Sequence, residues 1–398
     1  MAQPEDSAQP ALHRFQRWSF IIGIVGLALS ALGALLSPDQ FFRAYLVAYF
    51  FWLGVALGCL AIMMLHALTG GTWGIVIQRF LQAGARTLPL LAVLFVPLVF
   101  GLQRLYIWAR PEAVAADELL RHKSAYLNVP FFLIRAVIYF AIWLGVGYLS
   151  DRWSLAQEGA ADDRLWRRAR LFSGPGLVLY GLAITFASID WVMSLEPHWY
   201  STIYGFLVMV VQGLAALAFV IVMTALLARH RPLSEVIQPG HFHDLGNLLL
   251  MFVLLWGYLT YSQYVIIWSG NLPEEIPWYL ERSRGGWEWV AWVLVLCYFL
   301  VPFLLLLLRD LKRNARALSA LAAALTVMSF VYLFWQVEPA FQPPVRLYTH
   351  WIDVVAAIGL GGLWLAAFAW FLRQRPLLPL HEPYVQEALA HERESYTR

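Results

Sequence analysis

Ten stretches of the sequence are apolar over a length that can cross a lipid bilayer as a helix. A spanning helix needs roughly 20 apolar residues, because each residue advances the helix by only about 1.5 Å. The third stretch turns from amphipathic to apolar after Arg86, and we expect a kink near Pro89. The sequence therefore predicts an all-α polytopic membrane protein with about ten transmembrane helices. The ten stretches are 18–36, 41–68, 72–102, 129–149, 174–193, 200–227, 242–268, 287–308, 318–335 and 350–372.

The composition excludes a soluble protein with a large core. Hydrophobic residues make up 61% of the chain and charged residues only 13%, whereas about a quarter of the residues are charged in a soluble domain. The net charge of +3 gives no indication of nucleic acid binding. Cys59 and Cys297 both lie inside apolar runs, and we interpret them as packing residues.

The positions of the basic residues predict the orientation of the chain. With both termini in the cytoplasm, most of the 28 Lys and Arg residues fall on the cytoplasmic side, as the positive-inside rule requires. Residues 1–17 and 373–398 are then cytoplasmic tails, and 18–372 form a single transmembrane domain. In a Gram-negative cell the turn between the fifth and sixth spans would face the periplasm, and we call this side the outer side.

A weak internal repeat links the two halves of the chain. QRLYIW at 103–108 and QYVIIW at 263–268 each precede a long outer loop. Spans 2–5 (41–193) and 6–9 (200–335) would then be parallel repeats of four helices, flanked by spans 1 and 10.

The turn at 190–204 is the most polar and aromatic part of the centre of the chain. It contains Asp190, Glu196 and His198 together with two Trp and two Tyr. One interpretation is an interfacial anchor with a helix cap, since Trp and Tyr favour the headgroup level. The other is that Asp190 faces a functional cavity, because a carboxylate within the membrane is costly to bury.

Arg135 is the charged residue that most needs a partner. It lies about six residues, or roughly 10 Å, into the fourth span from the outer side, and Asp190 lies at a similar depth in the next span. Consecutive spans are usually neighbours, so the two residues can form an ion pair. Alternatively, Arg135 extends towards the outer headgroups.

Further polar residues at both ends of the spans are candidates for a proton path. Each alone fits a cap or a solvated rim residue, and Asp244 fits the first turn of the seventh span, where the helix dipole favours it. Mid-span hydroxyls and amides fit helix packing or a water chain. The candidates for the path are Asp190, Asp244, Glu196, His198, Gln263, Glu288 and Asp353.

The sequence has none of the spacings that attach haem or iron–sulfur clusters. There is no CxxCH site and no CxxC pair, and no two His face each other at mid-membrane depth. We therefore expect no covalently bound cofactor, no metal site and no redox centre within the chain.

Several motifs resemble those of a known family. The sequence is similar to the smaller NrfD-like integral membrane subunit of alternative complex III, in the polysulfide reductase membrane-subunit superfamily. The motifs run from about residue 69 to 290, and the span count extends the resemblance over nearly the whole chain. They are TGGTWG at 69–74, RTLP at 86–89, SLEPHWYST at 194–202, YSQY at 261–264 and WSGNLPEE at 268–275.

The resemblance implies a role beyond these residues. The family's complex is a bacterial quinol:cytochrome c oxidoreductase of the cytoplasmic membrane, with iron–sulfur and multihaem cytochrome c subunits on the periplasmic side. Its larger NrfD-like subunit is where the quinol site is usually placed. The smaller subunit, which has no catalytic activity alone, would brace the membrane arm and contribute to the surroundings of the quinol or to a proton path.

Two other functions remain open at this stage. A secondary transporter also fits a repeat with polar residues inside the spans. A purely structural membrane anchor would need no proton path at all.

Overall fold

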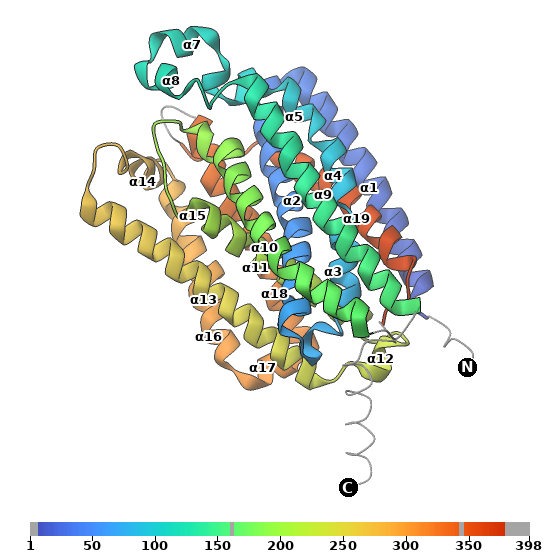
Figure 1. Ribbon diagram of the computed structural model, residues 1–398. Coiled ribbons are helices and arrows are strands. Elements are labelled where there is room, and N and C mark those ends of the chain that lie inside the picture. Colours follow the sequence, from blue (N-terminus) through green and yellow to red (C-terminus); the bar gives the residue numbers. More distant parts are fainter. Residues whose placement is uncertain (1–6, 160–162, 342–345, 379–398) are drawn as a thin grey trace.

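The computed structural model describes residues 7–159, 163–341 and 346–378, and this part of the chain is helical with no β-strand. Ten of its helical segments are long and apolar enough to cross a membrane. The sequence-based prediction of an all-α polytopic membrane protein is therefore confirmed, and lipid surrounds the bundle. Figure 1 shows the long helices running side by side.

The ten spans are built from the following helices. The first five spans contain α1 (Gln9–Leu36), α2 (Pro38–Thr69), the broken series α3 (Gln78–Ala85), α4 (Leu88–Leu94) and α5 (Val96–Phe100), α9 (Val129–Gly159) and α10 (Asp163–Trp191). The last five contain α11 (Tyr204–Leu227), α13 (Pro239–Gly270), the series α15 (Trp287–Leu294), η4 (Val295–Leu300) and α16 (Val301–Leu307), α18 (Ala315–Val337) and α19 (Trp351–Arg373).

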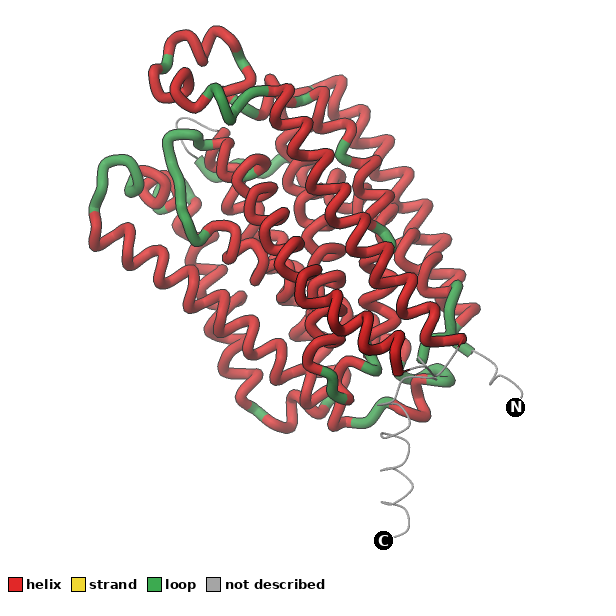
Figure 2. The backbone as a smooth tube through the Cα atoms, viewed as in Figure 1, coloured by secondary structure: helices red, strands yellow, loops and turns green. Residues whose placement is uncertain are grey.

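Short helices connect the spans. They are η1 (Thr72–Gly74), α6 (Leu102–Leu105), η2 (Ile107–Ala109), α7 (Pro111–Ala116), α8 (Glu118–Lys123), η3 (Met193–Leu195), α12 (Leu233–Val236), α14 (Pro277–Arg282), α17 (Arg309–Arg313) and η5 (Glu338–Phe341). Figure 2 shows how little of the described chain lies outside helices.

Two spans are interrupted at prolines. The third span breaks between α3 and α4, immediately before Pro89, and again before Pro97. The eighth span passes through a π-helical turn, η4, just before Pro302. Proline removes a backbone donor and clashes with the preceding turn, which explains why the regular hydrogen-bond pattern stops there.

The eight spans other than α1 and α19 form one continuous bundle, which we describe as two groups of four in chain order. The first group is α2, α3–α5, α9 and α10, the second is α11, α13, α15–α16 and α18, and both α2 and α10 pack against α11 across the boundary. These are the helices that the sequence assigned to two parallel repeats, and the repeat relationship itself stays a prediction.

α1 and α19 pack closely along each other outside the two groups. Their contact is lined by glycine, and a Cβ atom on Gly26 would lie 2.6 Å from Cα of Gly359. Small residues let two helix backbones approach closely, which is the main source of helix association where apolar contact with lipid costs nothing. The pair is completed by hydrogen bonds from Arg373 to Gln9 and Gln16.

The bundle has two distinct ends. One end, which we call the turn end, carries residues 190–204 with α7, α8 and α14; the other, the terminal end, carries α12, α17 and both described ends of the chain (Figure 1). α1 begins at Gln9, inside the segment expected to be a tail, because Pro10 suits the first turn of a helix. Residues 1–6 and 379–398 of the expected tails lie outside the described residues.

Candidate functional site

The turn at 190–204 is attached to both groups of helices. It leaves α10 after Trp191, makes the short helix η3 and enters α11 at Tyr204. Trp191, Leu195 and Trp199 are buried. Because so much of a connecting segment is buried, its backbone and side chains need partners from the protein.

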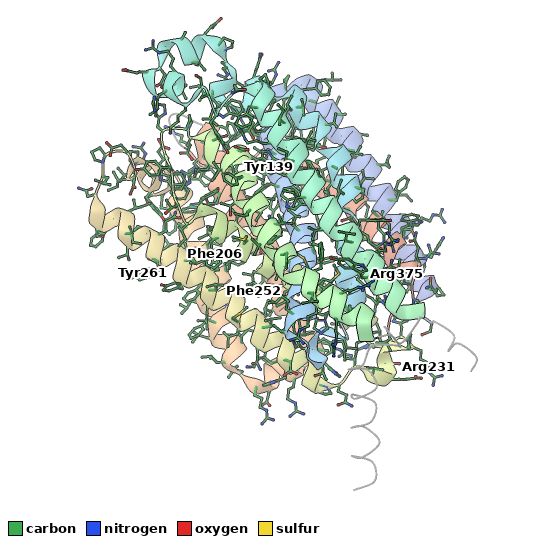
Figure 3. The ribbon with its side chains drawn as sticks, viewed as in Figure 1. Tyr139, Phe206, Arg231, Phe252, Tyr261 and Arg375 are labelled. Carbon is green, nitrogen blue, oxygen red and sulfur yellow. The ribbon has the colours of Figure 1, made fainter. Side chains whose placement is uncertain are left out.

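Arg135 and Asp190 form a two-pronged ion pair. Nε of Arg135 donates to Oδ2 of Asp190 at 2.7 Å, and Nη2 donates to Oδ1 at 3.0 Å. The hydroxyl of Tyr139 donates to the same Oδ2 at 2.6 Å. Asp190 is completely buried, so these three donors replace the water that the carboxylate loses. Figure 3 shows Tyr139 in the upper part of the bundle.

Aromatic rings surround the guanidinium of Arg135. Its central carbon lies 3.8 Å from the ring centre of Tyr126 and 4.4 Å from that of Phe131. Nη1 also donates to the carbonyl oxygen of Tyr126 at 2.9 Å. The geometry therefore corresponds to the ion pair and not to an arginine that extends to the headgroups.

The turn is also attached to the loop that precedes α9. The hydroxyl of Tyr106 donates to the carbonyl of Trp191 at 2.8 Å, and Nε1 of Trp108 donates to the hydroxyl of Ser194 at 3.1 Å. Nζ of Lys123 donates to the carbonyl of Pro197 at 2.6 Å. Burial of Lys123 lowers its pKa, while Asp117 opposes the shift.

His198 lies on the rim of this end. Its side chain is exposed, and Nε2 lies 2.8 Å from Oδ2 of Asp117. The pKa of Asp117 is below its usual value, chiefly because its carboxylate accepts from the backbone N–H of Leu120, with His198 as a further contributor. His198 therefore fastens α8 to the turn and does not lie in the interior.

Arg282 attaches the turn to the second group of helices. Nη2 of Arg282 donates to Oε2 of Glu196 at 2.6 Å and to the carbonyl of Gln336 at 2.7 Å. The guanidinium is completely buried and stacks on Trp278 at 3.8 Å. An arginine is suited to this place because its planar group donates to two oxygens and stacks on a ring at the same time.

Two further contacts hold the turn to α13 and α14. The rings of Trp199 and Trp278 stack at 4.7 Å. Ser201 donates to Oε1 of Gln263 at 3.0 Å, and Nε2 of Gln263 donates to the hydroxyl of Tyr279 at 3.1 Å. Gln263 is therefore a partner of the turn.

A second acidic group lies at the turn end, between α2, η5 and α19. Asp353 accepts from Gln40 at 2.7 Å and from the backbone N–H of His350 at 2.7 Å, and so caps α19. Glu338 is completely buried, and neither of its carboxylate oxygens has a hydrogen-bond partner among the described residues. Asp353 and Arg43 are the charged residues that interact electrostatically with the Glu338 carboxyl group.

A small cavity separates α2, α11 and α18. It has a volume of about 30 Å³ and is lined by Gln212, Tyr204, Tyr332 and Gln336 among others. Nε2 of Gln212 and Oε1 of Gln336 have no hydrogen-bond partner among the described residues. A volume of this size holds about two water molecules, whereas small-molecule sites measure several hundred Å³.

Two of the predicted path residues lie apart from these contacts. Glu288 accepts from the backbone N–H of Gly286 at 2.8 Å and stabilises the start of α15. Asp244 is exposed at the terminal end, with His243 3.6 Å away. The structure brings Asp190, Glu196, His198 and Gln263 together around one turn, and Asp353 lies beside Glu338 at the same end.

A partly buried ionic contact at the terminal end was not predicted from the sequence. Arg375 donates to both oxygens of Asp151, at 2.7 and 2.8 Å, and Nε of Arg86 lies 3.7 Å from the same carboxylate. Asp151 was expected in a loop and Arg375 in a tail, but α9 continues past the apolar run to Gly159. Figure 3 shows Arg375 towards the terminal end.

No group of three or more His, Cys, Asp or Glu within the described residues is arranged to hold a metal ion. Comparison with models of known protein families gives no match. Comparison with curated proteins gives no match either.

Proposed function

We propose that this chain is an integral membrane subunit of a bacterial quinol:cytochrome c oxidoreductase of the alternative complex III type, and that it braces the membrane arm. The motif resemblance suggests the complex. The observation that supports bracing is the attachment of the turn at 190–204 to both groups of helices, through Arg135 and Asp190 on one side and Arg282 and Glu196 on the other. Glu196 itself belongs to one of the motifs.

A brace must hold its docking face in a fixed shape. Arg282 and Arg135 are both buried, and each uses its guanidinium for a carboxylate and a backbone carbonyl. Removing one partner of a buried pair leaves an uncompensated charge, so such contacts resist opening. A transporter would instead rock one repeat against the other, and contacts that join the turn to both groups oppose that motion.

The partners follow from the same proposal. The turn end would face the periplasm and meet the iron–sulfur and multihaem cytochrome c subunits, while a lateral face would contact the larger NrfD-like subunit. Both termini would lie in the cytoplasm. The cavity between α2, α11 and α18 has room only for water, and we place the quinol at the border with that larger subunit, as the motif resemblance suggests.

The candidates for a proton path then separate by role. Asp190 accepts three hydrogen bonds from side chains and acts as a structural clamp. Glu338 is better placed to exchange a proton, because neither oxygen of its carboxylate has a hydrogen-bond donor among the described residues, and Asp353 lies beside it. Gln263 and Glu196 serve to hold the turn.

Purification of the tagged chain from its native membrane in mild detergent tests the proposal. We expect haem-staining and iron–sulfur polypeptides to co-elute in constant ratio with the chain. An unrelated tagged multi-pass protein from the same membrane is the control for non-specific capture. Elution of the chain alone, without haem, together with solute flux in liposomes would contradict the proposal and favour a transporter.

A further inference from the structure

A basic cavity opens at the terminal end, away from the turn. It lies between the end of α11, the start of α13 and the hairpin of α17 and α18, and its volume is about 920 Å³. Three arginines and one acidic residue line it, namely Arg229, Arg313, Arg316 and Asp310. The cavity is therefore electropositive and large enough for a charged headgroup.

The three guanidinium groups are available to a ligand. In the part of the chain that the structure describes, none of them takes part in an ion pair or a side-chain hydrogen bond. This contrasts with Arg135 and Arg282, whose donors are occupied by the protein itself. An arginine presents planar donors that match the oxygens of a phosphate.

The start of α18 adds to the positive potential. Arg316 lies in the first turn of this helix, which runs for 23 residues from Ala315. Asn314 already accepts from the backbone N–H groups of Arg316 and Ala317, at 3.0 and 3.3 Å. The helix dipole nevertheless favours an anion beside this end, and the arginine side chains supply the direct donors.

The depth of the cavity indicates where its ligand comes from. The span of α11 ends at Leu227, two residues before Arg229, and the span of α18 begins at Ala315, two residues after Arg313. The arginines therefore lie at the level of the lipid headgroups. Leu226, which also lines the cavity, is 61% exposed and continues the wall into the apolar part of the membrane.

We propose that this cavity binds the headgroup of an anionic phospholipid. The phosphate would receive donors from Arg229, Arg313 and Arg316, and an acyl chain would lie along Leu226. Asp310 would accept from a hydroxyl of the headgroup. Basic pockets between transmembrane helices are a common form of lipid recognition, and this proposal does not depend on the redox role.

Spin-labelled lipids test the site on the purified, full-length chain. We expect labelled phosphatidylglycerol to be immobilised more strongly than labelled phosphatidylcholine, and high salt to weaken the difference. The triple variant Arg229→Gln, Arg313→Gln, Arg316→Gln should lower the preference on the order of 100-fold, since each cation near the surface contributes about 1 kcal/mol. Arg316→Gln alone should give a smaller loss in the same direction.

A second triple variant is the matched control. Arg14→Gln, Arg17→Gln, Arg152→Gln removes the same charge from exposed arginines that do not line the cavity. An equal loss in this control would mean a general effect of charge and would overturn the site. An unchanged preference in the Arg229 triple variant would overturn it too. Displacement of the lipid by millimolar inorganic phosphate would show a soluble ligand and overturn the lipid assignment.

Discussion

Asp190 and Arg135 meet through both carboxylate oxygens, at 2.7 and 3.0 Å, although 55 residues separate them in the chain. Tyr139, one turn after Arg135 on α9, donates to the same carboxylate. The pair therefore joins α9 to α10 just before the chain enters the turn. The fixed shape of the turn end depends on this contact and on the Arg282–Glu196 contact that follows it.

Replacing Asp190 should destabilise the protein strongly. In Asp190→Asn the guanidinium of Arg135 stays buried without its counter-charge, and we expect a loss of about 3–5 kcal/mol in the free energy of unfolding. The double variant Arg135→Leu, Asp190→Leu should recover much of this loss, because no unpaired charge remains. Equilibrium unfolding in mixed detergent micelles measures the free energy of unfolding of the single and the double variant.

His198→Ala is the control for this pair, since its ion pair with Asp117 is largely exposed. We expect it to change the free energy of unfolding by less than about 1 kcal/mol. A loss in Asp190→Asn as small as that of the control would show that the buried pair does not hold the turn end.

Arg282 should tolerate neither glutamine nor lysine. Arg282→Gln removes the charge opposite Glu196, whereas Arg282→Lys keeps the charge but cannot donate to Glu196 and the carbonyl of Gln336 while stacking on Trp278. We therefore expect faster backbone hydrogen exchange around residues 194–203 in both variants, with a smaller increase in Arg282→Lys than in Arg282→Gln. If the turn in Arg282→Lys exchanges as slowly as in the parent chain, a positive charge alone is enough to hold the turn, and the planar guanidinium is not needed.

Glu281 should make the stability of the turn end depend on pH. Burial, and then the charge of Glu196, raise its pKa above the usual 4.5, against the pull of Arg282 and Arg284. Because the pKa of Glu281 is higher in the folded state than in the unfolded state, the protonated side chain favours folding. This contribution to the free energy of unfolding is fully present below the unfolded pKa and is lost as the pH rises through the folded pKa. Glu281→Gln should therefore raise the melting temperature at neutral pH.

The same variant should have no effect on the melting temperature below about pH 3, where the glutamate is protonated in both the folded and the unfolded state. Thermal melts over a range of pH measure the difference between Glu281→Gln and the parent chain. A gain that is independent of pH would contradict the electrostatic explanation.

Gly359 should be intolerant of a larger side chain. A Cβ atom there would lie 2.8 Å from backbone atoms of Gly26 and Leu27, so leucine would force α1 and α19 apart. We expect Gly359→Leu to lower the free energy of unfolding by roughly 1–3 kcal/mol. Gly145→Leu in α9 is the matched control, since a Cβ there meets open space; an equal loss in both would contradict the close packing.

The sequence predicted the features that depend on one segment at a time. Long apolar runs are enough to find ten spans, and the depth of Arg135 and Asp190 in consecutive spans is enough to suggest their pairing. The ends of the helices were less predictable. α9 and α10 continue as helices beyond the apolar runs that defined their spans, because polar residues also form helices where no lipid surrounds them.

Contacts between distant loops could not be predicted. Arg282 is 86 residues from Glu196, and only the folded position of α14 brings them together. Glu338 is brought in the same way within electrostatic range of Arg43 on α2, which lies far from it along the chain, and of Asp353 on α19, which lies in another span. Asp244 was selected for its residue type near the end of a span, but which face of α13 it occupies is set by the packing of that helix.

Photo-crosslinking from the turn end in native membranes shows whether redox subunits dock there. A photoreactive phenylalanine analogue at Tyr200, which is 51% exposed at the turn end, should capture a haem-bearing or iron–sulfur polypeptide. The same analogue at Leu226, which is exposed at the terminal end, should capture neither. If the turn end is the docking face, redox polypeptides are captured from Tyr200 and not from Leu226. Their absence at Tyr200, or their capture from Leu226 instead, would rule out docking at the turn end.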